Sequence, residues 1–260
     1  MSNFESITYN VNNRVATITM NRPKAMNAMS QQLRQEMIAA TSQADADDNV
    51  RVIVITAEGR GFCSGTDLSE GLAGFACIED QIQAEYKPIL DAIANSSKLY
   101  ISAVQGACAG IGTALAITCD LTVMADNAFF FLPFNAIGLV PDGGASYHFV
   151  KAMGYKRALQ LALESGRLGA AESLQYGLVN KVVALEELPS SVQAWAEILA
   201  EGAPIAQKLT KDCMRKAQTG ELEDIINLEA KHQNTCSASQ DSLNAIGSFF
   251  KKEKPVFRGE

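Results

Sequence analysis

The sequence has few of the features that mark metal-binding, nucleic-acid-binding or membrane proteins. It contains six cysteines but no C-x-x-C pair, so we expect no zinc site and a reducing compartment in which the thiols stay free. Acidic residues outnumber lysine and arginine by 29 to 22, for a net charge of −7. Such a chain lacks the basic surface that nucleic acid or an anionic membrane requires.

Other absences bear on location and on phosphate binding. No apolar run approaches the ~20 residues that span a bilayer, and the first residues lack a basic region followed by an apolar stretch. We therefore predict a cytoplasmic protein with no membrane partner. Neither the G-x-G-x-x-G nor the G-K-S/T spacing occurs, which disfavours phosphate cradling. Hydrophobic residues make up 47% of the chain, which is enough for a core that needs no disulfides.

The most informative stretch is residues 100–120. An apolar run at 101–104 leads through Gly106 to Gly110 and Gly112, and a helical pattern follows. Glycines at the start of a helix expose free backbone N–H groups, which suit an oxygen that becomes negative during a reaction. The alternative is that these glycines only allow a helix to pack tightly on a sheet.

Periodicity predicts a hairpin around Asn12-Asn13, followed by strands and helices that alternate as in right-handed parallel crossovers. A glycine-rich loop is predicted at 58–71, followed by one helix over 79–96. From Leu185 the pattern is helical throughout. We predict an α/β core at 1–184 and a helical region at 185–260, which makes subunit contacts or packs back on the core.

Among the acidic residues, Asp142 stands out because it lies in the turn Pro141-Asp142-Gly143-Gly144, just before a helical pattern. A carboxylate there is either a proton-transferring group or only the cap of that helix.

Five stretches in this order resemble motifs of the crotonase family, also called the enoyl-CoA hydratase/isomerase superfamily. They are 21–28, 61–68, 103–112, 117–120 and 138–144. The resemblance runs from about Ile7 to Phe257. It implies a crotonase-like spiral of ββα turns with a helical C-terminal trimerisation region, an acyl-CoA thioester as substrate, and a homotrimer or dimer of trimers. Coenzyme A would enter as part of the substrate, with no separate cofactor and no metal.

The resemblance also assigns site residues. It places the backbone N–H groups of Thr66 and Ile111 in an oxyanion hole. Arg22 and Lys24 match positions near the nucleotide of CoA, and Phe249 and Lys252 match a segment that covers it from a neighbouring subunit, although a solvated tail is the alternative. The remaining substrate-binding positions implied are Ala25, Ser64, Gly65, Asp67, Leu68, Gly110 and Phe134.

Departures from the family pattern point to the reaction. Hydratases of the family use two glutamates to activate water, and the matching positions here are Ala114 and Phe134. Asp142 remains, which resembles isomerases in which a lone acid moves a proton between C2 and C4 of a 3-enoyl-CoA. We expect apolar neighbours such as Phe131 and Phe134 to exclude water and to raise the pKa of Asp142.

Three alternatives remain open at this point. One is hydratase-like lyase chemistry. Another is an aroyl-CoA dehalogenase in which Asp142 attacks the ring, although such sites also use a histidine and a tryptophan; the chain has only His148 and His232, and Phe134 stands where the tryptophan would be. The third is a non-catalytic acyl-CoA binder.

Overall fold

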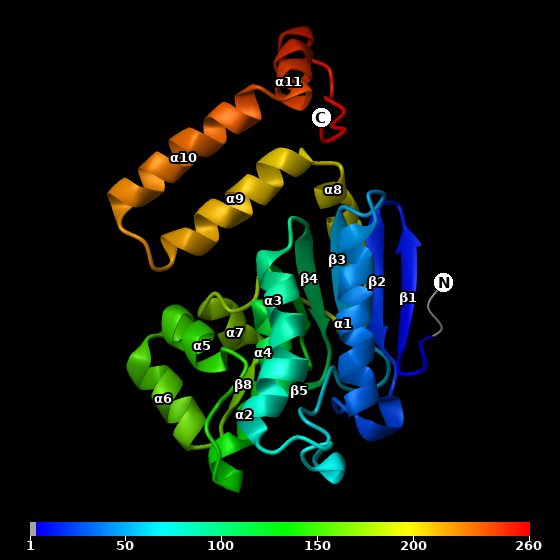
Figure 1. Ribbon diagram of the computed structural model, residues 1–260, viewed down its shortest axis with the longest axis vertical. Helices are drawn as coiled ribbons and strands as arrows, with labels where there is room; N and C mark the ends of the chain where they lie inside the picture. Colours follow the sequence, from blue (N-terminus) through cyan, green and yellow to red (C-terminus); the bar gives the residue numbers. More distant parts are fainter. Residues whose placement is uncertain (1–3) are drawn as a thin grey trace.

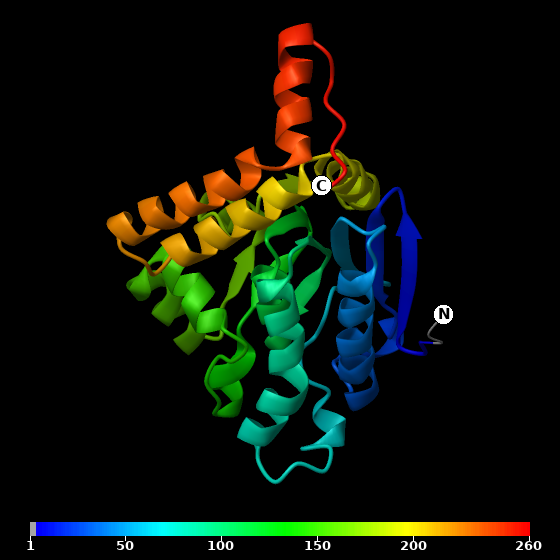
Figure 2. The same ribbon diagram turned by 45° about the horizontal axis from the view of Figure 1, so that its top comes forward.

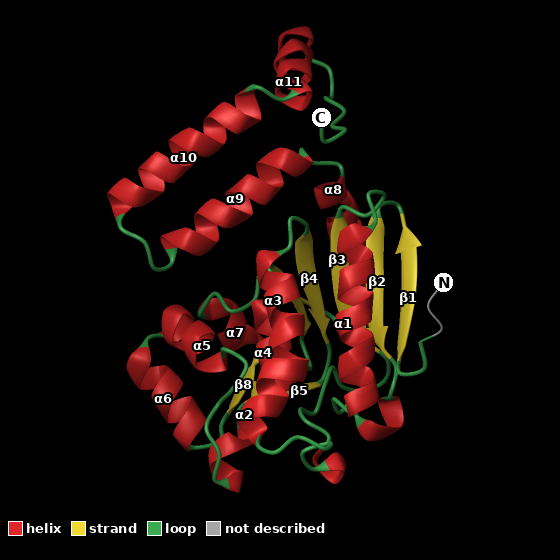
Figure 3. Ribbon diagram, viewed as in Figure 1, coloured by secondary structure: helices red, strands yellow, loops and turns green. Residues whose placement is uncertain are grey.

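A six-stranded sheet forms the centre of the core in this computed structural model, which describes residues 4–260 (Figures 1 and 3). The strand order is β1-β2-β3-β4-β6-β9, and only the β1–β2 pair is antiparallel. The strands are β1 (Ile7–Asn12), β2 (Val15–Met20), β3 (Val52–Ala57), β4 (Leu99–Val104), β6 (Leu121–Ala125) and β9 (Lys181–Val183). The near-continuous apolar runs of β3 and β4 are buried, as expected for parallel strands covered on both faces.

Helices cover the sheet and connect its parallel strands. Helix α1 (Gln31–Ala46) joins β2 to β3 and packs on β1, β2 and α3 (Lys87–Asn95). Helix α4 (Ile111–Thr118), buried along its whole length, packs on β4 and β6, and α8 (Leu188–Ala200) packs on β2, β3, β4 and β6. The structure thus confirms the predicted α/β crotonase-like architecture.

A second, smaller sheet holds the loops that build the site. Its strands, in the order β5-β7-β8, are β5 (Ala107–Ala109), β7 (Phe129–Phe131) and β8 (Arg167–Gly169). Around it lie α5 (Ala145–Met153), α6 (Tyr155–Leu163) and α7 (Ala170–Gln175). Sequence periodicity did not reveal β5 or β8, because three residues are too few to show an alternating pattern.

The C-terminal helices extend from one end of the core. Helices α9 (Pro204–Ala217) and α10 (Leu222–Ser237) run side by side, and α11 (Gln240–Lys251) projects away from the body (Figure 2). The segment after α11 returns toward the core, where the Arg51 guanidinium donates to the Phe257 carbonyl at 2.9 Å. Among residues 4–260, no helix combines the length and apolar character needed to cross a membrane.

Two predicted elements need correction. The hairpin turn is Asn13-Arg14 rather than Asn12-Asn13, because Asn12 pairs with Val15 and the two turn residues take left-handed φ values of 49° and 65°. The helix predicted over 79–96 is present as a continuous helical segment over 78–95, but it contains a π-helical turn. It consists of α2 (Ile78–Gln81), a π-helical turn (Ile82–Tyr86) and α3.

Candidate active site

Two glycine turns meet at the predicted oxyanion hole. A methyl group built on Gly65 would lie 3.3 Å from the Ala109 carbonyl oxygen and 3.8 Å from Gly110 Cα. Both glycines have positive φ, 101° at Gly65 and 55° at Gly110, which side chains rarely allow. The residues that follow them, Thr66 and Ile111, are therefore held on neighbouring stretches of backbone.

The amides of Thr66 and Ile111 are free to bind a ligand. Ile111 is the first residue of α4, so its N–H has no carbonyl within the helix to bond. Thr66 forms an isolated bridge with Met29, but the hydrogen bonds of that bridge use Gly65 and Asp67. No described residue accepts a hydrogen bond from either amide. Two unpaired N–H groups on adjacent turns are what stabilisation of an oxyanion requires.

Asp142 lies next to this pair of turns. A methyl group built on the following residue, Gly143, would meet Ile111 Cδ1 and would lie 2.7 Å from Ala114 Cβ. Asp142 Oδ1 is buried and has no hydrogen-bond partner among the described residues. Burial raises the pKa of the carboxyl to about 6. The predicted rise in pKa is therefore present, although the Phe131 ring lies against Arg167.

The structure excludes the interpretation of Asp142 as a helix cap. Helix α5 begins at Ala145 with Gly144 at the N-cap, and no side chain caps it. The only hydrogen bond between Asp142 and α5 runs from the Ala145 N–H to the backbone carbonyl of Asp142. The carboxyl is thus left available for chemistry.

Both positions that hold glutamate in hydratases of the family lie at this site. Ala114 is in contact range of Gly143, and Phe134 Cζ would lie 3.8 Å from a methyl group built on Gly110. Both side chains are buried. The site therefore presents apolar groups where a hydratase presents two acids.

The predicted CoA-binding positions are brought together only in part. Arg22 forms a 3.0 Å ion pair with Asp67, whose pKa is lowered by hydrogen bonds from the Ser69 hydroxyl and from the Arg22 guanidinium. Both residues are thus engaged with each other. Other predicted positions on the same loops are exposed to solvent: Lys24, Ala25, Ser64 and Leu68.

Phe249 and Lys252 do not reach this site within one chain. They lie on and just after α11, at the end of the molecule opposite the loop between β3 and α2 (Figure 1). The Phe249 side chain is 77% exposed. Within one chain, these two residues are therefore not brought together with Thr66, Ile111 and Asp142.

Sequence reasoning missed a buried polar cluster beneath Thr66. Arg34 of α1 is fully buried and pairs with Glu85 at 2.6 Å, and the Tyr86 hydroxyl donates to Thr66 Oγ1 at 3.0 Å. The signal available was an arginine inside the apolar pattern of α1 and a glutamate just before Pro88, in the predicted helix. A buried arginine requires a nearby acid.

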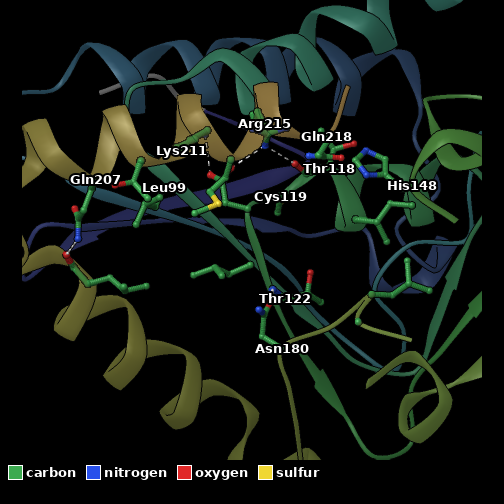
Figure 4. Close-up of a pocket in the computed structure, with 18 of the residues that line it drawn as sticks. Leu99, Thr118, Cys119, Thr122, His148, Asn180, Gln207, Lys211, Arg215 and Gln218 are labelled. Atoms are coloured by element: carbon green, nitrogen blue, oxygen red, sulfur yellow. Dashed lines mark hydrogen bonds and ion pairs between the residues drawn. The ribbon is translucent and has the colours of Figure 1, made fainter. Parts of the chain in front are cut away.

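A cavity lies elsewhere, between α9 and the core (Figure 4). It measures about 700 Å³, and residues around it include His148, Lys211, Arg215 and Asn180. Asp120 of the core forms ion pairs with two residues of α9, Lys211 at 2.8 Å and Arg215 at 2.7 Å. Asp142, Thr66 and Ile111 do not line it. No three His, Cys, Asp or Glu side chains within residues 4–260 are grouped to hold a metal ion.

Comparison with known proteins places this geometry in context. A family model for enoyl-CoA hydratase/isomerase matches residues 10–260. A probable enoyl-CoA hydratase of Rhodobacter capsulatus is 34% identical over 256 residues, covering 98% of this chain and 99% of the relative. The 1,2-epoxyphenylacetyl-CoA isomerase of Escherichia coli is 30% identical over 260 residues, with 98% and 99% coverage. The structure of an enoyl-CoA hydratase subunit I from Geobacillus kaustophilus superposes with a TM-score of 0.93 at 34% identity, covering 100% of both chains.

Proposed function

The chain belongs to the enoyl-CoA hydratase/isomerase family, and we propose that within it this protein moves a double bond in a 3-enoyl-CoA, with Asp142 as the proton shuttle. The observation that carries the proposal is the Asp142 carboxyl, whose Oδ1 has no hydrogen-bond partner among the described residues and whose pKa is about 6. It lies beside two free amides, with no second acid at the hydratase positions.

The reaction needs one base that also serves as an acid. With the thioester carbonyl oxygen at the amides of Thr66 and Ile111, the Asp142 carboxylate removes a proton from C2. The electron pair delocalises over the carbonyl oxygen and C4 as a dienolate, whose oxygen the two N–H groups stabilise. Asp142 then returns the proton to C4, which leaves the double bond between C2 and C3.

The pKa of Asp142 suits this double role. A carboxyl with a pKa of about 6 is mostly ionised at neutral pH, yet it holds a proton more readily than an ordinary aspartate. The reaction does not activate a water molecule. It therefore needs no acidic side chain at the positions of Ala114 and Phe134. Hydration of a 2-enoyl-CoA, by contrast, requires an activated water and a second proton donor.

We extend the proposal to the rest of the substrate. Arg22, Lys24, Ala25, Ser64, Gly65, Asp67, Leu68, Gly110 and Phe134 are proposed to line the acyl-CoA site. Phe249 and Lys252 of a neighbouring copy would cover the nucleotide, because α11 lies too far from the site in its own chain. This requires more than one copy of the chain, and we propose a homotrimer or a dimer of trimers.

Product analysis tests the reaction. The protein is mixed with a medium-chain 3-enoyl-CoA, and in parallel with the corresponding 2-enoyl-CoA in H₂¹⁸O, and both mixtures are analysed by mass spectrometry and by absorbance of the conjugated thioester. We expect conversion of the first substrate to 2-enoyl-CoA and little ¹⁸O-labelled 3-hydroxyacyl-CoA from the second. Rapid ¹⁸O incorporation would indicate a hydratase instead. Binding without any conversion would indicate an acyl-CoA binder, and halide release from a haloaroyl-CoA would indicate a dehalogenase.

A further inference from the structure

The geometry points to Tyr86 as a positioning residue for this reaction: its hydroxyl fixes the Thr66 arm of the oxyanion hole, and the buried Arg34–Glu85 pair fixes Tyr86. The inference rests on the proposed function, because it assigns the Thr66 amide to the thioester oxygen. Tyr86 itself touches the arm and not the substrate.

The hydroxyl of Tyr86 has a defined polarity. Arg34 Nη1 donates to the Tyr86 oxygen at 3.3 Å, and the Tyr86 hydroxyl donates to Thr66 Oγ1 at 3.0 Å. The Arg34 guanidinium carbon also lies 5.1 Å from the centre of the Tyr86 ring. Because guanidinium nitrogens only donate, the proton of the phenol is directed at Thr66.

Arg34 supports the same arm from a second direction. Its Nη1 donates to the Met29 carbonyl, and Met29 pairs with the backbone on both sides of Thr66 through Gly65 O and the Asp67 N–H. Arg34 is fully buried and is itself held by Glu85 at 2.6 Å. The guanidinium thus links the main chain at Met29 and the side chain at Tyr86 to one residue, Thr66.

The cluster matters because the loop it supports is intrinsically loose. Residues 58–71 contain four glycines, and each glycine adds backbone freedom that packing must restrict. An oxyanion donor has to be placed within a fraction of an ångström before the reaction, since donors that reorient during catalysis contribute less. Fixing Thr66 from its side chain restricts the direction of its N–H.

Tyr86 also lies near enough to Asp142 to sense its charge. Leu90, four residues later on the same helical face, would contact a methyl group on Gly143, beside Asp142. Burial raises the pKa of Tyr86, Arg34 lowers it, and the charge of Asp142 raises it further. The phenol therefore stays protonated as Asp142 titrates, so removing its hydroxyl is expected to leave the pH profile in place.

The first experiment compares wild type, Tyr86→Phe and a matched control, Tyr9→Phe. Tyr9 lies on the edge strand β1, and its hydroxyl has no partner among the described residues. For each protein, two quantities are measured. One is the rate of isomerisation of a medium-chain 3-enoyl-CoA. The other is the infrared carbonyl band of bound [1-¹³C]octanoyl-CoA, which shifts when hydrogen-bond donors polarise the thioester. For Tyr86→Phe we expect kcat to fall about tenfold, as for loss of one hydrogen bond, with unchanged KM and pH profile and a smaller carbonyl shift.

A second pair of variants covers the case in which Tyr86→Phe folds poorly. Thr66→Val removes the hydroxyl acceptor and should lose as much activity as Tyr86→Phe, whereas Thr66→Ser keeps the acceptor and should lose clearly less activity than Thr66→Val. The double variant Tyr86→Phe/Thr66→Val should be no slower than either of these two single variants. Equal activities of Thr66→Val and Thr66→Ser, or a wild-type carbonyl shift that Tyr86→Phe retains, would overturn the inference alone. No carbonyl shift in wild type would overturn the proposed function, and this inference with it.

Discussion

The Asp142 carboxyl does not cap α5, because the turn places Gly144 at the N-cap. The sequence Pro141-Asp142-Gly143-Gly144 was compatible with either role, since an aspartate before a helix usually caps it. Whether Asp142 caps α5 depends on the exact residue at which the helix begins. Sequence patterns locate helix ends less well than any other feature of a helix. The burial that raises the pKa of this carboxyl also has a thermodynamic cost.

That cost makes Asp142→Asn a stabilising substitution at neutral pH. Between its usual pKa of 3.8 and its folded-state pKa of about 6, the folded protein binds more protons than the unfolded chain, so stability falls as the pH rises through this window. We expect Asp142→Asn to raise the free energy of unfolding by about 1–3 kcal/mol at pH 7, and by nothing below about pH 4. Urea denaturation at fixed protein concentration measures the difference.

The exposed Asp126 provides the control, because Asp126→Asn should leave stability unchanged at both pH values. A loss of stability in Asp142→Asn at pH 7 would show that the carboxylate makes a favourable contact that the structure does not contain.

The role of Tyr86 could not be predicted from the sequence, because its pattern resembles that of a core residue. A tyrosine on the apolar stripe of a predicted helix is usually part of the core, and Tyr86 is indeed only 3% exposed. Its hydrogen bond to Thr66 joins residues 20 positions apart. Only the three-dimensional packing of the 58–71 loop against this helix brings them together.

At the scale of elements, the π-helical turn at Ile82–Tyr86 follows from a proline. Pro88 has no N–H to donate to the carbonyl four residues earlier, and the Lys87 N–H bonds Ile82 O, five residues back. The wider turn changes the helical phase at Tyr86. The hydrophobic pattern continues across it, which is why periodicity predicted one uninterrupted helix.

Asp120 is one of the groups that attach α9 to the core. Asp120 pairs with Lys211, which is nearly buried, and with Arg215, and it also accepts from the Tyr100 N–H at 2.9 Å. Asp120→Asn leaves Lys211 buried without an anion. Because an uncompensated buried charge is costly, we expect a loss of about 3 kcal/mol in the free energy of unfolding.

The exposed pair Lys87–Asp91 gives the comparison. Asp91→Asn should cost less than about 1 kcal/mol in the same denaturation experiment, because solvent screens surface pairs. Similar losses for the two variants would contradict a structural role for the buried pair.

At the scale of the whole molecule, α11 carries an apolar face that its own chain does not cover. Leu243, Ile246 and Phe250 recur at helical spacing and are more than half exposed, with Phe250 at 79%. Burying such a face against a second copy would also bring Phe249 and Lys252 to a neighbouring active site.

Disruption of that face tests the proposed assembly. We expect wild type to sediment as a trimer or a dimer of trimers, and the double variant Leu243→Glu/Ile246→Glu to sediment as smaller species with at least tenfold lower activity, because charged groups oppose apolar burial. Val11→Glu makes the same kind of change at an exposed position of β1 and should alter neither property. A wild-type monomer with full activity would contradict the assembly.

Much of this architecture could be predicted from the sequence, because apolar runs such as Ile101–Val104 indicate buried strands and the glycine turn at 110 indicates the start of a helix. The close contacts around the site could not be predicted from the sequence. The contact of Gly143 with Ile111 and Ala114, and the network from Glu85 to Thr66, join segments whose approach depends on the complete fold.

The most direct test of Asp142 as the sole proton shuttle is α-proton exchange. A medium-chain 3-enoyl-CoA is incubated in D₂O with wild type or with Asp142→Asn, and deuterium in recovered substrate and product is measured by NMR. We predict that the protonated Asp142 carboxyl exchanges with D₂O while the dienolate is bound, so that wild type forms 2-enoyl-CoA deuterated at C4 and substrate deuterated at C2. Asp142→Asn, still folded and still binding the thioester, should show no exchange at C2. Exchange at the wild-type rate in Asp142→Asn would contradict the account, because another group would then be moving the proton.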